Sequence, residues 1–214
     1  MPESTANNVI HLVGRIISDF AFSHEVFGEG FYHFTLEALR LSEVTDSLPL
    51  TISERLFHRE QFPVGTLVHV TGQIRSYNSY VEAEHRNKLV LTVFVKEMDL
   101  AVPPGQNPND AYINGYICKA PVYRTTPFDR EICDLLVAVN RSYNKSDYIP
   151  CIAWGRNARY AGKLSIGDNV LILGRMQSRV YQKKHESGEV EDKTAYEVSI
   201  TKLDAVEAGD QRAD

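Results

Sequence analysis

The sequence lacks the features of secreted, disulfide-bonded and membrane proteins. It has only three cysteines, Cys118, Cys133 and Cys151, and an odd number without close spacing favours neither a disulfide framework nor a zinc site. Its longest purely apolar runs, such as residues 135–139, are far too short to cross a bilayer. The first eight residues contain no basic and no apolar segment of the kind that directs secretion. We therefore expect a soluble cytoplasmic protein with reduced thiols and no membrane partner.

The sequence also lacks a catalytic or metal-binding motif. Its seven histidines are scattered, without ligand spacing to a cysteine or a carboxylate. It has no glycine loop that could hold phosphates, and no Ser or Cys lies in a recognisable nucleophile elbow. We expect a protein that is not an enzyme and uses no cofactor or metal, in which His33 and His69 are ordinary strand residues.

The most informative feature that is present is an internal repeat. Residues 7–56 align with residues 108–157 without a gap, at a shift of 101 positions. Eight positions are identical, where ordinary residue usage gives about three by chance. The pairs are Asn8/Asn109, Gly14/Gly115, Ile16/Ile117, Phe27/Phe128, Arg40/Arg141, Asp46/Asp147, Pro49/Pro150 and Arg55/Arg156. A repeat of this length predicts two similar domains of about 100 residues each.

The boundary between the two domains is marked by proline. Residues 103–109 hold three prolines and a glycine, which favours a short, fairly stiff linker. We therefore predict a first domain over residues 1–102, a second over residues 110–206 and a short tail over residues 207–214.

Each half consists mainly of short segments typical of strands. They are rich in Val, Ile, Tyr and Thr, and several alternate between apolar and polar residues. The expected strands are residues 9–17, 32–40, 48–52, 66–75 and 88–95 in the first half, and residues 112–118, 134–141, 148–154, 169–179 and 195–201 in the second. A less regular segment separates the third strand from the fourth in each half, and residues 157–161 are expected to form one or two helical turns.

This order predicts an all-β protein with two tandem five-stranded Greek-key barrels of the OB-fold type. Glycines within the expected strands, at Gly14, Gly72, Gly115 and Gly174, fit a small barrel, because glycine there marks a bulge or a sharp bend. Two β-sandwiches of another topology are the alternative.

The net charge of −5 is unevenly distributed. Residues 1–102 hold 8 Lys and Arg against 13 Asp and Glu, whereas residues 103–206 hold 14 against 12. Positive charge is therefore concentrated in the second domain. Nucleic-acid binding depends on a local stripe of cations rather than on the total charge.

Aromatic and cationic residues occur together in the second domain. Tyr148 and Trp154 are six residues apart on one expected strand, so both side chains point to the same face. Tyr181 lies on a strand that we expect to be a neighbour. The surrounding cations are Arg141, Lys145, Arg156, Arg159, Arg175, Arg179, Lys183 and Lys184. Rings stack on unpaired bases and cations neutralise phosphates, so this pattern predicts a face for single-stranded nucleic acid.

Several of these residues also have a structural interpretation. Trp154 is the only tryptophan, and the alternative places it in the barrel core. Tyr148 could pack at the barrel rim, and Lys183 and Lys184 could belong to a solvated hairpin tip.

Arg141 could bind nucleic acid or serve a structural role, because an arginine, Arg40, also stands at the matching position of the first domain. An ion pair from Arg141 to Asp147, and from Arg40 to Asp46, would explain the match without nucleic acid.

Four segments carry a further pattern: residues 8–16 (NVIHLVGRI), 136–141 (LVAVNR), 146–154 (SDYIPCIAW) and 174–181 (GRMQSRVY). They resemble the bacterial single-stranded DNA-binding protein family. The resemblance implies an OB-fold that coats exposed strands in replication, repair or recombination. It also implies that Tyr148, Trp154 and Tyr181 stack on bases.

The chain departs from this family in its first domain. Serines stand at the positions of the three aromatic residues: Ser47, Ser53 and Ser79. We therefore expect this domain to serve mainly in assembly, with Arg75, Tyr77 and Tyr80 as weaker candidates for nucleic-acid binding.

Family members usually have one OB-fold per chain and four per assembly, so two folds per chain suggest a homodimer. Their acidic, hydrophobic C-terminal tip, which recruits repair enzymes, has no counterpart in the short tail of residues 207–214.

The sequence thus predicts a non-enzymatic protein that binds single-stranded DNA in the cytoplasm, associated with the nucleoid. Replication or repair proteins are candidate partners. A charged hairpin over residues 180–196 is expected to reach over the strand as a flap. The alternatives are a protein-interaction module of replication restart (primosome-type), an RNA-binding OB protein, and an accessory protein of a phage or plasmid.

Overall fold

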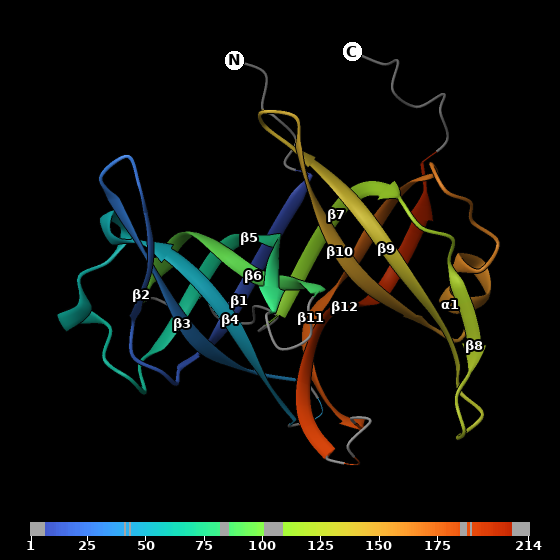
Figure 1. The fold of residues 1–214 in the computed structure, drawn as a ribbon, viewed down its shortest axis with the longest axis horizontal. Helices are drawn as coiled ribbons and strands as arrows, with labels where there is room; N and C mark the ends of the chain where they lie inside the picture. Colours follow the sequence, from blue (N-terminus) through green and yellow to red (C-terminus); the bar gives the residue numbers. More distant parts are fainter. Residues whose placement is uncertain are drawn as a thin grey trace.

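The computed structural model describes residues 7–40, 42, 44–81, 86–100, 109–184, 188 and 190–206. The predicted linker falls almost wholly outside this part of the chain, and the predicted tail does so completely. The described residues form two β-barrels that lie side by side (Figure 1).

The first barrel contains the strands β1 (Asn8–Ile16), β2 (Ala21–Val26), β3 (Glu29–Leu39), β4 (Thr45–Ser53), β5 (Leu67–Val81) and β6 (Arg86–Asp99). Two short 3₁₀ turns, η1 (Glu54–Leu56) and η2 (Arg59–Gln61), separate β4 from β5. The second barrel contains β7 (Asn109–Ile117), β8 (Val122–Thr125), β9 (Glu131–Arg141), β10 (Lys145–Trp154), the helix α1 (Arg156–Ala161), β11 (Asn169–Lys184) and β12 (Val190–Ala205).

Strand pairing confirms the predicted Greek-key barrels. In the first, β1 pairs with both β3 and β5, β3 pairs with β4, and β5 pairs with β6. A short parallel pairing of β4 with β6 closes the barrel. The second barrel repeats every one of these pairings with β7, β9, β10, β11 and β12. The predicted strands and the predicted helical turns are therefore confirmed.

Two strands were not predicted. β2 and β8 extend the hairpins with β3 and β9 at the outer ends of the molecule (Figure 1). Most of their residues are exposed, so they lack the alternation between buried and exposed positions that reveals the other strands. The sequence signal used for the prediction is therefore absent from both.

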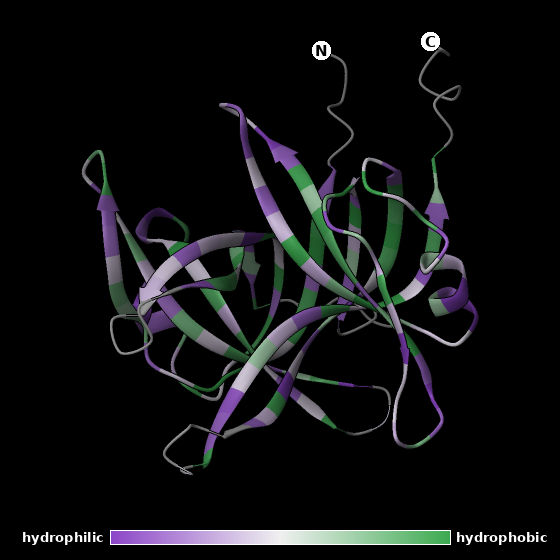
Figure 2. Cartoon of the chain, turned by 45° about the vertical axis from the view of Figure 1, so that its right-hand side comes forward, coloured by the Kyte–Doolittle hydropathy of each residue, from purple (hydrophilic) through white to green (hydrophobic). Residues whose placement is uncertain are grey.

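Alternation along the strands builds the core. In β1, Ile10, Leu12 and Ile16 are fully buried, while His11, Val13 and Arg15 are partly or largely exposed. Figure 2 shows the same alternation of hydrophobic and hydrophilic residues along strands of both barrels. Each fully buried side chain of this size stabilises the fold by about 1.5–3 kcal/mol. The thiols of Cys133 and Cys151 are free and buried, and burial raises the pKa of each, as expected for inert core cysteines.

Two of the four strand glycines, Gly72 and Gly174, mark irregularities, as predicted. The register of β5 against β6 shifts between Thr71 and Gly72, and that of β11 against β12 shifts between Leu173 and Gly174. A Cβ atom at Gly72 would stand 2.7 Å from the carbonyl oxygen of Phe94, which is too close for any other residue. These bulges bend the strands that close each barrel.

The two barrels share one continuous sheet, because β1 pairs with β7 in antiparallel fashion. Ile10 lies opposite Ala111 at the centre of this pairing, and these two residues are 101 positions apart, which is the shift of the repeat. An approximate two-fold axis therefore passes between them, as in a symmetric dimer whose two copies are joined into one chain.

A buried carboxylate joins the barrels on each side of this axis. On one side, Asp46 accepts hydrogen bonds from its own domain's Arg40 at 2.7 and 2.5 Å. It also accepts one from the backbone N–H of Ser178 in the second domain at 2.8 Å, and Arg175 of that domain lies 3.4 Å away. Asp46 is completely buried, so all of its charge is compensated by these groups.

Asp147 repeats this arrangement on the other side of the axis. It accepts a hydrogen bond from the backbone N–H of Ser76 at 2.8 Å and from Arg75 at 2.9 Å, both in the first domain. Arg141 of its own domain lies 3.5 Å from the carboxylate. The ion pairs predicted for Arg40 and Arg141 are therefore both confirmed.

Candidate nucleic-acid interface

The strand β10 presents two aromatic rings to solvent. Ile149, Cys151 and Ala153 point into the core, whereas Tyr148 is 44% exposed and Trp154 39% exposed. The prediction that these two rings share the outward face is confirmed. The alternative that places Trp154 in the core is wrong.

Trp154 lies at the edge of a hollow of about 610 Å³ between α1 and the end of β12. Arg156, Asn157, Tyr160 and Thr201 also line this hollow. Asn157 donates a hydrogen bond to the carbonyl of Thr201 at 3.0 Å, which fixes the helix against the strand. An exposed ring beside a guanidinium group is an arrangement that can stack a base and hold its phosphate.

Tyr181 does not lie on a strand next to Tyr148 and Trp154, contrary to the prediction. β12 lies between β10 and β11 in the sheet. Tyr181 stands opposite Lys193 in the β11–β12 hairpin, which projects from the barrel (Figure 1). The guanidinium carbon of Arg179 is 5.6 Å from the centre of its ring. The two residues form a separate cation–aromatic pair on the hairpin arm.

The predicted cations differ in what they contact. Arg159 pairs with Glu131 at 2.7 Å, and the pKa of Glu131 is lowered by a hydrogen bond from Tyr123 and by Arg159. Arg179 lies 3.8 Å from Glu197. Within the described part of the chain, Lys145 and Arg156 form no ion pair.

Three other predicted cations are placed differently. Arg175 faces Asp46 at the domain junction, and burial lowers its pKa. The backbones of Lys183 and Lys184 belong to β11, but their side chains lie outside the described residues.

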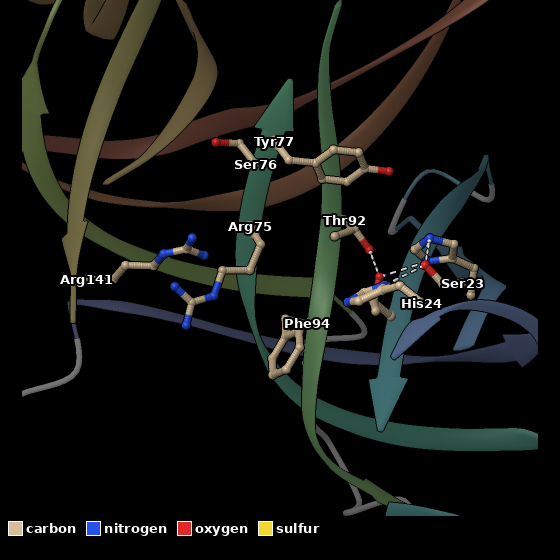
Figure 3. Close-up of a pocket in the computed structure, with 10 residues that line it drawn as sticks. Ser23, His24, Arg75, Ser76, Tyr77, Thr92, Phe94 and Arg141 are labelled. Atoms are coloured by element: carbon tan, nitrogen blue, oxygen red, sulfur yellow. Dashed lines mark hydrogen bonds between the residues drawn. The ribbon is translucent and has the colours of Figure 1, made fainter. Parts of the chain in front are cut away.

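The first domain contains a site that the sequence did not reveal. A cavity of about 440 Å³ opens on its outward face and reaches the junction with the second domain (Figure 3). Its lining comes from β2 to β6 and from β9 of the second domain: Ser23, His24, His33, Thr51, Arg75, Ser76, Tyr77, Thr92, Phe94 and Arg141. Two of the weaker candidates, Arg75 and Tyr77, line this cavity, while the third, Tyr80, is exposed further along β5.

Hydrogen bonds link the polar side chains of this cavity into a chain. Ser23 Oγ is 2.8 Å from His24 Nδ1 and 2.7 Å from His33 Nε2. His33 Nδ1 is 3.0 Å from Thr51 Oγ1, which is 2.8 Å from Thr92 Oγ1. His33 lies on β3, as expected, and its ring links Ser23 to Thr51. Burial lowers the pKa of His33, with a smaller lowering effect from the charge of His24.

The other end of the cavity is aromatic and cationic. The ring of Phe94 lies 5.8 Å from that of Phe31, between centres. Lys96 Nζ is 5.0 Å and the guanidinium carbon of Arg75 is 5.9 Å from the centre of the Phe94 ring. Figure 3 shows Arg75 and Arg141 pointing toward each other beside Phe94.

The sequence carried no direct signal for this cavity. Ser23 and His33 are ten positions apart, and Thr51 and Thr92 are 41 positions apart. Only the pairing of β2 with β3, and of β4 with β6, brings these side chains together.

No group of three or more His, Cys, Asp or Glu side chains in the described ranges could hold a metal ion. No helix in the part of the chain that the structure describes is long and apolar enough to span a membrane.

The second domain resembles known protein sequences. Residues 108–206 match the sequence profile of the Single-strand binding protein family. "Single-stranded DNA-binding protein 1" and "Single-stranded DNA-binding protein 2" of two Staphylococcus aureus strains are each 33% identical over 81 residues, or 35% of this chain and 48% of theirs. The chain thus spans about half the length of the curated relatives it matches.

Solved structures agree on the fold. The wild-type single-stranded DNA binding protein from Thermus aquaticus superposes with a TM-score of 0.73 at 19% identity, covering 97% of this chain and 96% of that one. A deletion mutant of the same protein gives a TM-score of 0.66 at 18% identity, over 93% and 94% of the two chains. The tandem arrangement of two barrels therefore has a solved counterpart. The second domain, over residues 108–206, is thus similar to the Single-strand binding protein family.

Proposed function

We propose that the protein binds single-stranded DNA without base specificity and coats strands that replication, repair or recombination expose. The observation that carries this proposal is the pair of outward rings on β10, Tyr148 and Trp154, with Arg156 beside the second ring. They lie in the domain that matches the family, whose curated members are named for binding single-stranded DNA.

The mechanism needs no chemical step. Bases of an unpaired strand stack on the exposed rings, and each stacked base contributes about 1–3 kcal/mol. Lys145 and Arg156 neutralise phosphates and release counterions, which makes binding weaken as salt rises. Duplex DNA keeps its bases paired inside the double helix, so none of its bases is free to stack on the exposed rings. The protein holds the strand open by mass action.

The second domain supplies the main binding face in this proposal. The β11–β12 hairpin, with Arg179 and Tyr181, reaches over the bound strand. The first domain holds the second in place through Asp46 and Asp147 and adds weaker contacts. A homodimer would bring four OB-folds together, and replication or repair proteins would act on the coated strand.

Tryptophan fluorescence tests this proposal directly. Trp154 is the only tryptophan, so its emission reports on the proposed face without any substitution. We expect poly-thymidine to quench it strongly, salt to reverse the quenching, and duplex DNA to have little effect. Polyuridine in the same titration measures whether RNA binds as well.

The contrary result is equally clear. If iodide quenches Trp154, and so reaches it, while neither poly-thymidine nor polyuridine does, the proposal is wrong. The protein-interaction alternative would then stand.

A further inference from the structure

The cavity on the first domain shares no lining residue with the hollow at Trp154 and has its own chemistry. It has a polar end formed by the hydrogen-bonded chain from His24 to Thr92, and a cationic end formed by Arg75 and Arg141. Phe94 lies between the two ends (Figure 3). Its volume of about 440 Å³ lies within the range of roughly 300–1,000 Å³ for small-molecule sites.

A β-bulge creates the polar end. In the pairing of β2 with β3, Phe22 lies opposite Tyr32 and His24 lies opposite Phe31, so Ser23 has no partner in the register. The bulge turns the Ser23 hydroxyl toward His33, its hydrogen-bond partner. Bulges often re-aim a side chain at a functional site. In the second domain the corresponding pairing of β8 with β9 runs without a register shift.

The hydrogen-bonded chain has a direction. Thr92 donates to the carbonyl oxygen of Pro49 at 3.3 Å, and a carbonyl oxygen can only accept. Thr51 therefore donates to Thr92, and His33 Nδ1–H donates to Thr51. It follows that Ser23 donates to His33 Nε2 and accepts from His24.

This direction determines whether the polar end of the cavity presents a hydrogen-bond donor or an acceptor to a ligand. In the resulting neutral tautomer, Nδ1 of His24 carries the hydrogen and its Nε2 is an acceptor on an exposed side chain. The polar end therefore suits a ligand edge that carries an N–H donor, such as the amino or imino group of a nucleobase.

The cationic end suits a phosphate. Arg75 and Arg141 come from different domains and share one buried carboxylate, that of Asp147. Two positive charges face one negative charge, so one positive charge remains for a ligand anion. Arginine hydrogen bonds to a phosphate are charge-assisted and strong.

We propose that this cavity is a nucleotide pocket that receives one unpaired base between Phe94 and the His24–Thr92 chain, with its phosphate at Arg75 and Arg141. The proposal rests on the proposed function, because a bound single strand supplies the nucleotide. It gives the first domain a site that reads a base edge, whereas the second domain only stacks bases. The pocket is incomplete without Arg141, so it exists only where both domains are joined.

The second domain cannot form the same pocket. The parallel pairings place Thr51 beside Phe94 in the first domain and Ile152 beside Ser199 in the second. The second domain thus has Ile152 in place of the Thr51 hydroxyl and Ser199 in place of the Phe94 ring. This supports the inference that the pocket is a specialised feature of the first domain.

The experiment uses the full chain and trithymidylate with a 5′-phosphate. Histidine imidazole resonances in ¹H–¹³C NMR spectra report on the pocket, and Trp154 fluorescence reports on the β10 face. We expect the His24 and His33 resonances to shift saturably. Phe94→Ser introduces the second domain's residue and should weaken this response at least tenfold, while Trp154 quenching stays unchanged.

Arg141→Gln and Arg40→Gln form a matched pair. Each removes one arginine from a buried carboxylate, but only Arg141 lines the cavity. Arg141→Gln should weaken the histidine response about tenfold, because a charge-assisted phosphate contact is lost. Arg40→Gln should leave it unchanged. Thermal melts establish that each variant is folded at the temperature of the titration.

The outcomes separate the two proposals. Unmoved histidine resonances together with Trp154 quenching would overturn the pocket alone. An equal loss in the Arg40→Gln variant would also overturn it, since domain orientation would then explain the effect. Absence of both signals would overturn the proposed function.

Discussion

At the centre of the molecule the two domains use the same residues in the same way. Asp46 binds the backbone of Ser178 across the junction, and Asp147 binds that of Ser76. On the outward faces the domains differ: the first has a polar cavity, and the second has the exposed ring of Trp154 beside a hollow of its own. The matched positions of the repeat thus hold the domains together, and the unmatched positions distinguish what each face can bind.

Not all matched positions of the repeat lie in the barrels or at the junction between the domains, however. Phe27 and Phe128 correspond in the repeat, and both are almost fully exposed in the turns that follow β2 and β8. Packing within a barrel cannot explain this match.

The largest expected effect tests the shared junction. Asp46→Ala removes the carboxylate that Arg40, Arg175 and the Ser178 N–H share. It leaves two partly buried cations facing each other and the Ser178 N–H without its acceptor, so we expect a loss of about 3–5 kcal/mol in the free energy of unfolding. Urea unfolding measures this loss.

The matched control is Asp204→Ala. Its exposed pair with Lys202 should contribute less than about 1 kcal/mol. Equal losses in the two variants would show that the buried carboxylate is not what joins the domains.

The next effect tests the difference between the outward faces. Trp154→Ala and Tyr148→Ala should each weaken binding of poly-thymidine by about 1–3 kcal/mol, because each removes a stacking ring. Tyr77→Ala in the first domain should weaken it less. Fluorescence anisotropy of a labelled strand measures all three affinities. A loss for Tyr77→Ala equal to the other two would mean that both faces bind the strand alike.

The sequence predicted those parts of the structure that depend on local periodicity. Alternation located the barrel strands, and an even spacing placed Tyr148 and Trp154 on one face. The position of Tyr181 could not be obtained in this way, because strand adjacency depends on the closure of the barrel, which inserts β12 between β10 and β11.

The cavity could not be predicted from the sequence for a related reason. It depends on a bulge at Ser23 and on pairings between distant strands, and neither leaves a periodic pattern in the sequence. Arg141 was open to two interpretations for the same reason. It forms the predicted ion pair and also lines the cavity, and only the joined domains reveal both.

The smallest expected effect is on the pH dependence of stability, in which the two domains should differ. Burial lowers the pKa of His33 below its ordinary value of 6.5, so the unfolded chain binds a proton more readily than the folded one. The stability that neutral His33 contributes is therefore complete above about pH 6.5 and is lost as the pH falls toward the lowered pKa. The residue at the matching position of the second domain is Asp134, so this loss belongs to the first domain.

Urea unfolding at pH 7.5 and pH 5.0 measures this contribution as a difference between variants. His33→Gln removes the titrating group, so the stability of this variant should fall less between the two pH values than that of the unmodified chain. His58→Gln, at an exposed histidine, should behave like the unmodified chain. If His33→Gln lost as much stability on acidification as the unmodified chain, His33 and its hydrogen bonds would play no part in the acid sensitivity of the first domain.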